Sequence, residues 1–256
     1  MSVFSSVDAQ PDPSLLVGYL DLIARAAAGM KHYAVAAHAL HQPDGLVLDL
    51  GCGAGHDLVL LASAGLRPVG VDASAFMLAT AAGRRGTEHV PLVQSAGEAL
   101  PFLDNTLAGC RIERVLMHVV DPLAVLVEVV RCLRPGALIT VYEPNWDSFL
   151  VRSDHGNEAV DWIAPSRHPG IGGKLWGLIE EAGCDVLDRV EELSVWRSLA
   201  VLDRVVGLEA SVVRAVDARR VSRVEADRWV AEQRGRESRA EFRSTISKVL
   251  IVARKR

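Results

Sequence analysis

The sequence has few aromatic residues and no excess of basic ones. Phe, Trp and Tyr make up 5% of its 256 residues, and 28 Lys and Arg stand against 32 Asp and Glu, a formal net charge of -4. Proteins that bind nucleic acid by stacking or by phosphate contacts are normally richer in aromatic or basic side chains. An anionic membrane surface also favours basic proteins. We therefore expect no nucleic acid and no membrane as partner.

Cysteines and long apolar runs are scarce as well. The four cysteines, at 52, 110, 132 and 184, form no Cys-x-x-Cys pair, which is typical of a reduced, cytoplasmic protein. Every run of about 18 residues contains a charged residue or a turn signal, so we expect no membrane-spanning helix. The first residues lack the basic and apolar regions of a signal peptide. Half of the residues are nonetheless hydrophobic, enough to bury a sizeable core.

Short apolar segments alternate with helical ones in the middle of the chain. Strands are predicted at 45–50, 68–74, 90–96, 106–114 and 137–144, with helices at 56–64, 74–83 and 121–133. This alternation predicts a mostly parallel sheet with helices on both faces. Flanking it, we predict helices at 14–40 (broken near Gly29), 170–183 and 199–239, strands at 186–197 and 245–256, and a mobile segment at 145–169.

The string VLDLGCGAG at 47–55 carries the most chemical information. A predicted strand runs into a glycine-rich turn that opens a helix, so the backbone can approach a ligand and the helix offers free N–H groups. The dinucleotide fingerprint G-x-G-x-x-G is not met, because His56 stands where the third Gly belongs. No Gly-Lys-Ser/Thr follows either, so a P-loop is absent. The pattern disfavours a nicotinamide oxidoreductase.

Asp72 ends the next predicted strand, in VDAS at 71–74. A carboxylate there can accept hydrogen bonds from both hydroxyls of a ribose, although it could instead cap the helix that follows. Asp49, just before the glycines, adds negative potential that suits a cationic ligand. Together these residues predict a nucleoside with a small charged tail and no pyrophosphate.

Five blocks of sequence now point to one family: VLDLGCGAG (47–55), VGVDAS (69–74), GEALPF (97–102), ERVLMHVVDP (113–122) and RCLRPGALITVYEP (131–144). In this order and spacing the chain resembles the class I S-adenosylmethionine-dependent methyltransferases, and within them the menaquinone/ubiquinone-type branch that acts on small molecules. YLDLIAR (19–25) and HPGIGGKLWGLIEEAGC (168–184) also look like that branch.

The resemblance implies the positions of the cofactor-binding residues. Around the methionine portion of S-adenosylmethionine it places Asp49, Gly51, Cys52 and Gly53. Around the ribose and the adenine it places Asp72, Ala73, Met77, Ala96, Gly97 and Glu98. Facing the sulfonium and the substrate it places residues 110–114, among them Arg111 and Ile112. Tyr19, on the N-terminal helix, would cover the cofactor.

One departure from the family concerns the adenine. Members usually carry Gly-Asp-Ala-Glu where this chain reads Ser-Ala-Gly-Glu at 95–98, so the carboxylate that would accept from the adenine amino group is replaced by Ala96. One hydrogen bond is worth about 0.5–1.5 kcal/mol, at most about a tenfold loss of affinity, so we still expect the cofactor to bind. The substitution also hints at an alternative, in which the fold catalyses a cyclisation or rearrangement without methyl transfer.

His118 is the candidate general base. It lies in ERVLMHVVDP, where the family often has a His at the mouth of the cleft, and an unperturbed pKa of about 6.5 suits the deprotonation of a hydroxyl. The alternative is a half-buried packing residue. His168 and Trp146 could line the substrate pocket, and Trp146 could equally be core. No His has a metal-ligand spacing, so we predict no metal.

The sequence therefore predicts one Rossmann-like α/β domain at 43–256, with a seven-stranded, mostly parallel sheet whose last strand is antiparallel. An N-terminal helical cap (1–42) and insertions at about 145–170 and 198–240 would form a lid. We expect methyl transfer from S-adenosylmethionine to a small biosynthetic acceptor, with S-adenosylhomocysteine as product. O-methylation is favoured, with C- or N-methylation open, and the protein would be a monomer or homodimer.

Overall fold

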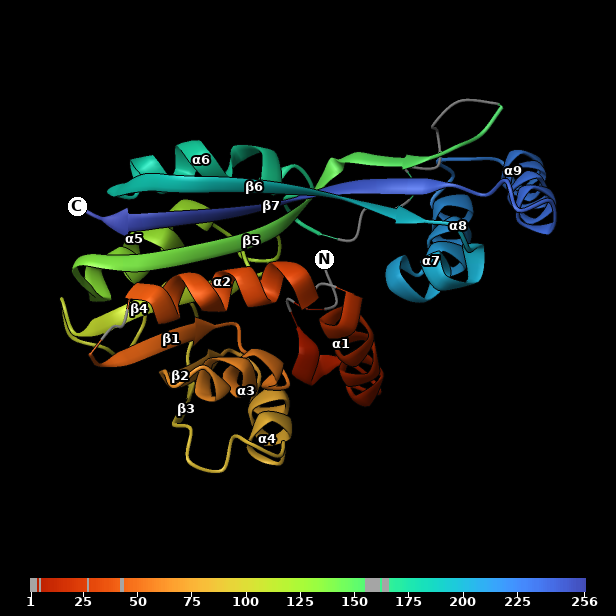
Figure 1. The fold of residues 1–256 in the computed structure, drawn as a ribbon. Coiled ribbons are helices and arrows are strands. Elements are labelled where there is room, and N and C mark those ends of the chain that lie inside the picture. Colours follow the sequence, from red (N-terminus) through yellow and green to blue (C-terminus); the bar gives the residue numbers. More distant parts are fainter. Residues whose placement is uncertain (1–3, 5, 27, 42–43, 155–161, 163–165) are drawn as a thin grey trace.

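A seven-stranded sheet organises the chain, and its strands lie in the order β3-β2-β1-β4-β5-β7-β6 (Figure 1). The computed structural model describes residues 4, 6–26, 28–41, 44–154, 162 and 166–256. All neighbouring pairs are parallel except those that involve β7, which is antiparallel to both β5 and β6. The strands are β1 (Leu46–Leu50), β2 (Arg67–Asp72), β3 (Leu92–Gln94), β4 (Leu107–Glu113), β5 (Leu133–Val151), β6 (Cys184–Trp196) and β7 (Ser244–Lys255). The predicted fold class and the antiparallel last strand are confirmed.

Helices cover both faces of this sheet, as the alternation of segments predicts. One face carries α2 (Ala28–His41), α3 (His56–Ser63) and α4 (Ala75–Ala82), and the other carries α5 (Pro122–Cys132) and α6 (Ile171–Glu181). Successive strand residues point to opposite faces. Tyr142 of β5 packs against Met30 and Ala34 of α2, whereas its neighbour Val141 joins the core under α5 and α6.

Two helix starts are fixed by side chains that the sequence places before them. The Ser74 hydroxyl accepts from the N–H of Met77 and caps α4, so the helix begins where β2 has just ended. The Asp121 carboxylate accepts from the N–H groups of Leu123 and Ala124, and Pro122 occupies the first turn of α5. The carboxyl ends of the strands and these helix starts meet at one edge of the sheet.

The end of the sheet differs from the sequence prediction. The prediction of a mobile segment from residue 145 is wrong for residues 145–151. There β5 continues and pairs with β7, as far as the pair of Val151 with Ser244. This extension carries three helices at its tip (Figure 1), namely α7 (Leu199–Val206), α8 (Leu208–Asp217) and α9 (Arg223–Ser238). The rest of that predicted segment falls mostly outside the described residues. The domain boundaries and the lid stay predictions.

The first N-terminal helix lies near the carboxyl edge of the sheet, and the second packs on one face. The predicted helix at 14–40 is two helices, α1 (Ser14–Ala26) and α2, and α1 contacts α7 of the extension (Figure 1). A short 3-10 turn, η2 (Val7–Ala9), precedes them, and the Asp8 carboxylate accepts from Ser74 Oγ and from the N–H of Ala75. Within the described ranges, no helix is both long and apolar enough to span a membrane.

Candidate cofactor and substrate site

The turn between β1 and α3 is held in a conformation that requires glycine. Gly51, Gly53 and Gly55 have φ of 68°, 51° and 80°. The N–H groups of Gly51 and Cys52 both donate to the carbonyl of Val71 on β2, at 2.7 and 3.0 Å. A Cβ on Gly51 would lie 2.3 Å from Val115 Cγ2. The turn therefore packs tightly against β2 and Val115, and Gly51 and Gly53 line the cavity at this edge without side chains.

Asp72 links this turn to the next helix. Its Oδ2 accepts from the N–H of Gly53 at 2.8 Å and its Oδ1 from the N–H of Ser74 at 2.9 Å. Each carboxylate oxygen has a second lone pair, which can accept a hydroxyl proton. Burial raises the pKa of Asp72 even though these backbone donors favour the charged form. The carboxylate is fixed in place while part of its accepting capacity stays open.

A cavity of about 820 Å³ opens beside these groups. It is lined by twelve of the fourteen residues predicted for the site, which are Tyr19, Gly51, Cys52, Gly53, Asp72, Ala73, Met77, Ala96, Gly97, Glu98, Arg111 and His118. Asp49 and Ile112 are not on the lining. Ile112 is fully buried in the core, because alternation along β4 sends it to the face opposite Arg111 and Glu113. The roles of the twelve residues in binding stay predictions.

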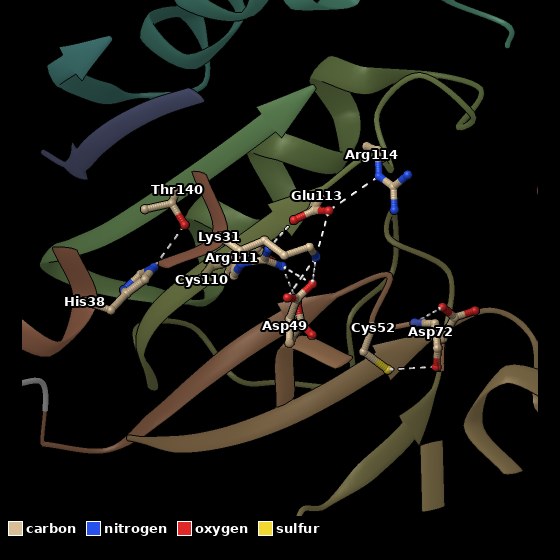
Figure 2. A network of polar contacts seen from close by, with 12 residues as sticks. Lys31, His38, Asp49, Cys52, Asp72, Cys110, Arg111, Glu113, Arg114 and Thr140 are labelled. Carbon is tan, nitrogen blue, oxygen red and sulfur yellow. Dashed lines mark hydrogen bonds and ion pairs between the residues drawn. The ribbon is translucent and has the colours of Figure 1, made fainter. Parts of the chain in front are cut away.

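A buried cluster of ion pairs forms the floor of the cavity (Figure 2). Lys31 Nζ lies 2.7 Å from Asp57 and 2.8 Å from Glu113. The Arg111 guanidinium contacts Asp49 at 3.3 Å, Asp57 at 2.9 Å and also Glu113. We expected Asp49 to offer negative potential to a cationic ligand. Its charge is instead compensated by Arg111, and Asp49 does not line the cavity.

Two carboxylates of the cluster have pKa values shifted in opposite directions. Burial raises the pKa of Asp49 to about 7, against the attraction of Arg111. Burial would also raise that of Glu113, but the charges of Arg111 and Lys31 outweigh it and lower the pKa to about 2. Arg114 lies 3.4 Å from Glu113 and adds a third cation. When Asp49 is ionised, the cluster holds three cations, Lys31, Arg111 and Arg114, and three carboxylates.

His118 lines the cavity and belongs to a group of aromatic rings. Its ring centroid is 5.3 Å from that of Phe4, and Phe4 is 5.7 Å from Tyr19. Burial, and then the charge of Arg114, lower the pKa of His118 to about 4. The imidazole is therefore neutral at pH 7 and able to accept a proton, although it is a weaker base than the unperturbed value suggests. Its role as a base stays a prediction.

Glu143 positions the segment that carries His118. Its Oε1 accepts from the N–H of Val115 at 2.8 Å and from that of Leu116 at 2.7 Å, and burial raises its pKa to about 8. His168 acts on the same segment. Its ring lies 3.1 Å from the carbonyl of Val119, and it does not line the cavity as expected; Arg167 does.

His38 and Cys52 are buried and have structural roles. His38 is buried against Thr140, and burial lowers its pKa to about 4 (Figure 2). Burial raises the pKa of the Cys52 thiol, so it stays protonated. Among the described residues no group of three or more His, Cys, Asp or Glu is placed to hold a metal ion.

Several lining residues were missed from the sequence. Lys31 belongs to the ion-pair floor, and Phe4 belongs to the N-terminal cap, in which only Tyr19 was named; Arg114, in contrast, lies in the 110–114 segment expected to face the substrate. A signal for Lys31 existed, since it follows Met30 on the apolar side of a helix with no acidic neighbour in sequence. Arg204 and Arg214 reach the cavity from α7 and α8, which lie in the 198–240 insertion predicted to form a lid, although neither arginine was singled out.

The fold and the site together define a Rossmann-like α/β protein with a cavity at the carboxyl edge of its sheet, where ligands of such folds bind. Residues 48–141 match the family described as "Methyltransferase domain". The chain is 37% identical over 228 residues to an uncharacterized 37.1 kDa protein in transposon TN4556 of Streptomyces fradiae, covering 84% of this chain and 65% of that protein. A demethylmenaquinone methyltransferase of Corynebacterium kroppenstedtii is 39% identical over 102 residues, 40% of this chain and 43% of the enzyme.

A solved structure shows the same fold. The YcgJ protein of Bacillus subtilis superposes with a TM-score of 0.59 at 18% identity, over 88% of this chain and 99% of that one. Residues 48–141 thus match a methyltransferase domain, and over about 100 residues the chain is similar to the demethylmenaquinone methyltransferases. It spans less than two thirds of the length of either curated relative.

Proposed function

We propose that this protein transfers a methyl group from S-adenosylmethionine to a small-molecule acceptor. The observation that carries the proposal is the fixed carboxylate of Asp72. The N–H groups of Gly53 and Ser74 hold it at the edge of the 820 Å³ cavity, directly beside the exposed backbone of the glycine turn. A ribose that donates both hydroxyls to Asp72 would lie next to that backbone.

The residues around Asp72 fit the rest of the cofactor. Ala73 and Met77 offer apolar surface for the adenine, and Gly97 packs closely against α5, because a Cβ there would lie 3.1 Å from Val125. Near the turn, a Cβ on Gly53 would lie 3.3 Å from Leu20, so only glycine leaves the backbone accessible. When bound, S-adenosylmethionine supplies an activated methyl group on a sulfonium.

The protein's own task is then to align the acceptor. Holding two reactants in a reactive geometry can lower a barrier by about 7–11 kcal/mol. Phe4, Tyr19 and His118 pack together on the cavity lining and would keep water from the reacting atoms. For a hydroxyl acceptor, neutral His118 would take the proton as the oxygen–carbon bond forms and the carbon–sulfur bond breaks. This step supports O-methylation as the favoured reaction.

Isothermal titration calorimetry with S-adenosylhomocysteine tests the cofactor assignment. We expect one site on the wild-type protein and, for Asp72→Asn, a loss of about tenfold or more, because two charge-assisted hydrogen bonds are weakened. Asp217→Asn, an exposed acid on α8 that does not line the cavity, is the matched control and should bind as wild type. Absence of binding, or equal affinity for Asp72→Asn, would contradict the proposal.

Product analysis separates methyl transfer from the alternative of a methyl-free cyclisation. With an acceptor present, methyl transfer forms S-adenosylhomocysteine in a one-to-one ratio with methylated product. Conversion of a substrate without any S-adenosylhomocysteine, measured by mass spectrometry, would favour the cyclisation or rearrangement instead.

A further inference from the structure

The cavity has a second wall, which carries none of the residues assigned to the cofactor. It is built from one face of the extended strands β5, β6 and β7. Alternate residues of β5 and β7 line it, because side chains two apart share a face. The lining residues of these strands are Tyr142, Pro144, Trp146, Trp196, Ile246 and Lys248. Apart from Lys248, this wall is aromatic or apolar.

Positive charge gathers around this wall. Arg114 and Lys248 are its inner cations, with side chains only 19% and 15% exposed. Arg167, Arg204 and Arg214 are exposed at its rim, the last two on α7 and α8. Lys248 lies opposite Pro144 in the pairing of β5 with β7, so it sits among the apolar side chains. Burial lowers the pKa of Lys248, and the neighbouring charge of Arg114 lowers it further, against the effect of Glu192.

Negative charge does not balance these cations inside the cavity. Of the four carboxylates on the lining, Asp57 and Glu113 are engaged by Lys31 and Arg111, Glu113 also lies 3.4 Å from Arg114, and the other two belong to the cofactor side. Lys248 has a distant partner outside the lining, Glu192 at 3.9 Å.

The rim cations are no better balanced. In the described part of the chain no carboxylate lies within ion-pair distance of Arg167, Arg204 or Arg214. Arg214 donates to the neutral hydroxyl of Ser211.

Two buried hydrogen-bond donors on the same wall are also unused. Tyr142 and Trp146 are 2% and 8% exposed, and neither Tyr142 Oη nor Trp146 Nε1 has a hydrogen-bond partner among the residues that the structure describes. Buried polar groups are normally satisfied, by protein, water or ligand. The wall therefore combines apolar surface with an excess of donors and cations, which matches a ligand rich in acceptor atoms.

We propose that the acceptor molecule is an anionic amphiphile. Its carboxylate, sulfonate or phosphate group would lie against Arg114 and Lys248, and its ring or hydrocarbon part against Trp146, Trp196 and Ile246. The assignment of this ligand as the methyl acceptor rests on the proposed function. Its recognition by the wall does not, so the two can be tested apart.

A pair of fluorescent probes that differ by one anionic group tests the recognition. 8-Anilinonaphthalene-1-sulfonate carries a sulfonate on an aromatic skeleton, and N-phenyl-1-naphthylamine is the same skeleton without it. Affinities of both probes are measured on the full chain, with and without saturating S-adenosylhomocysteine. We expect the wild-type protein to prefer the sulfonate, and Lys248→Met to lose about tenfold of that affinity while its affinity for the neutral probe changes by less than about twofold.

A second variant and a matched control keep the test decisive. The double variant Arg204→Gln with Arg214→Gln removes two exposed charges at the rim. It should weaken the binding of the sulfonate probe, but not of the neutral probe, by about threefold to tenfold at low salt. It decides the question if Lys248→Met does not fold. Arg228→Gln, exposed on α9 and outside the cavity, should change nothing.

Three results would overturn the inference: no preference for the sulfonate, equal weakening of both probes by the cavity variants, or an equal effect of Arg228→Gln. Failure of S-adenosylhomocysteine to bind would instead count against the proposed function. In that case the probe preference of the unloaded protein still decides whether the wall selects anions.

Discussion

Replacing Arg111 with Met is expected to destabilise the fold far more than removal of a surface arginine. Arg111 contacts Asp49, Asp57 and Glu113, and its side chain is 2% exposed. Lys31 compensates Asp57 and Glu113 but does not contact Asp49. Above about pH 7, where Asp49 is ionised in the wild-type protein, the variant leaves this buried carboxylate without a cation, which typically costs about 3–5 kcal/mol. For a domain of this size that is a fall in Tm of about 6–20 °C.

Urea unfolding followed by tryptophan fluorescence and circular dichroism measures this loss, and Arg131→Met is the control. Arg131 pairs with Glu128 and Asp104, but its side chain is 34% exposed, so its removal should cost less than about 1 kcal/mol. Adding Asp49→Asn to Arg111→Met removes the stranded charge and should recover part of the stability. The reasoning is refuted if Arg111→Met loses no more than Arg131→Met, or if Asp49→Asn restores nothing.

Three further predictions concern the groups that shape the cavity. The folded pKa of Glu143, about 8, lies above its ordinary value, so its contribution is complete below about pH 4 and is lost as pH rises through 8; Glu143→Gln should flatten the decline in unfolding free energy between about pH 5 and 8, and an unchanged slope would contradict this. Histidine NMR, assigned with His118→Gln, should show His118 neutral down to about pH 5.5, and an inflection near 6.5 would show that burial does not lower its pKa. Gly51→Ala should abolish S-adenosylhomocysteine binding measured by calorimetry, because its Cβ would lie 2.3 Å from Val115 in a backbone with φ of 68°; wild-type affinity would mean that the turn adjusts freely.

Local pattern determined most of the fold. The alternation of buried strands with amphipathic helices between 45 and 144 predicted the parallel part of the sheet, and Ser74 and Asp121 marked helix starts that the structure places at the same residues. These features depend on side-chain periodicity and capping, which act over a few residues and are legible in a single sequence.

Pairing over long distances decided what the sequence did not. The continuation of β5 to Val151 depends on hydrogen bonds to β7, about a hundred residues later, and polar sequence such as Asn145–Ser148 carries no local sign of it. The length of this extension sets where α7 and α8 stand, and hence that Arg204 and Arg214 reach the cavity.

The site divides in the same way. The glycine turn and Asp72 are adjacent to their own strands, so sequence alone predicted that they would meet at the carboxyl edge of a parallel sheet. The charge at the cavity floor was decided by the tertiary structure, because Lys31 on α2 and Arg111 on β4 are brought to Asp57 and Asp49 from distant parts of the chain. Electrostatic compensation depends on distance in space, which residue order does not encode.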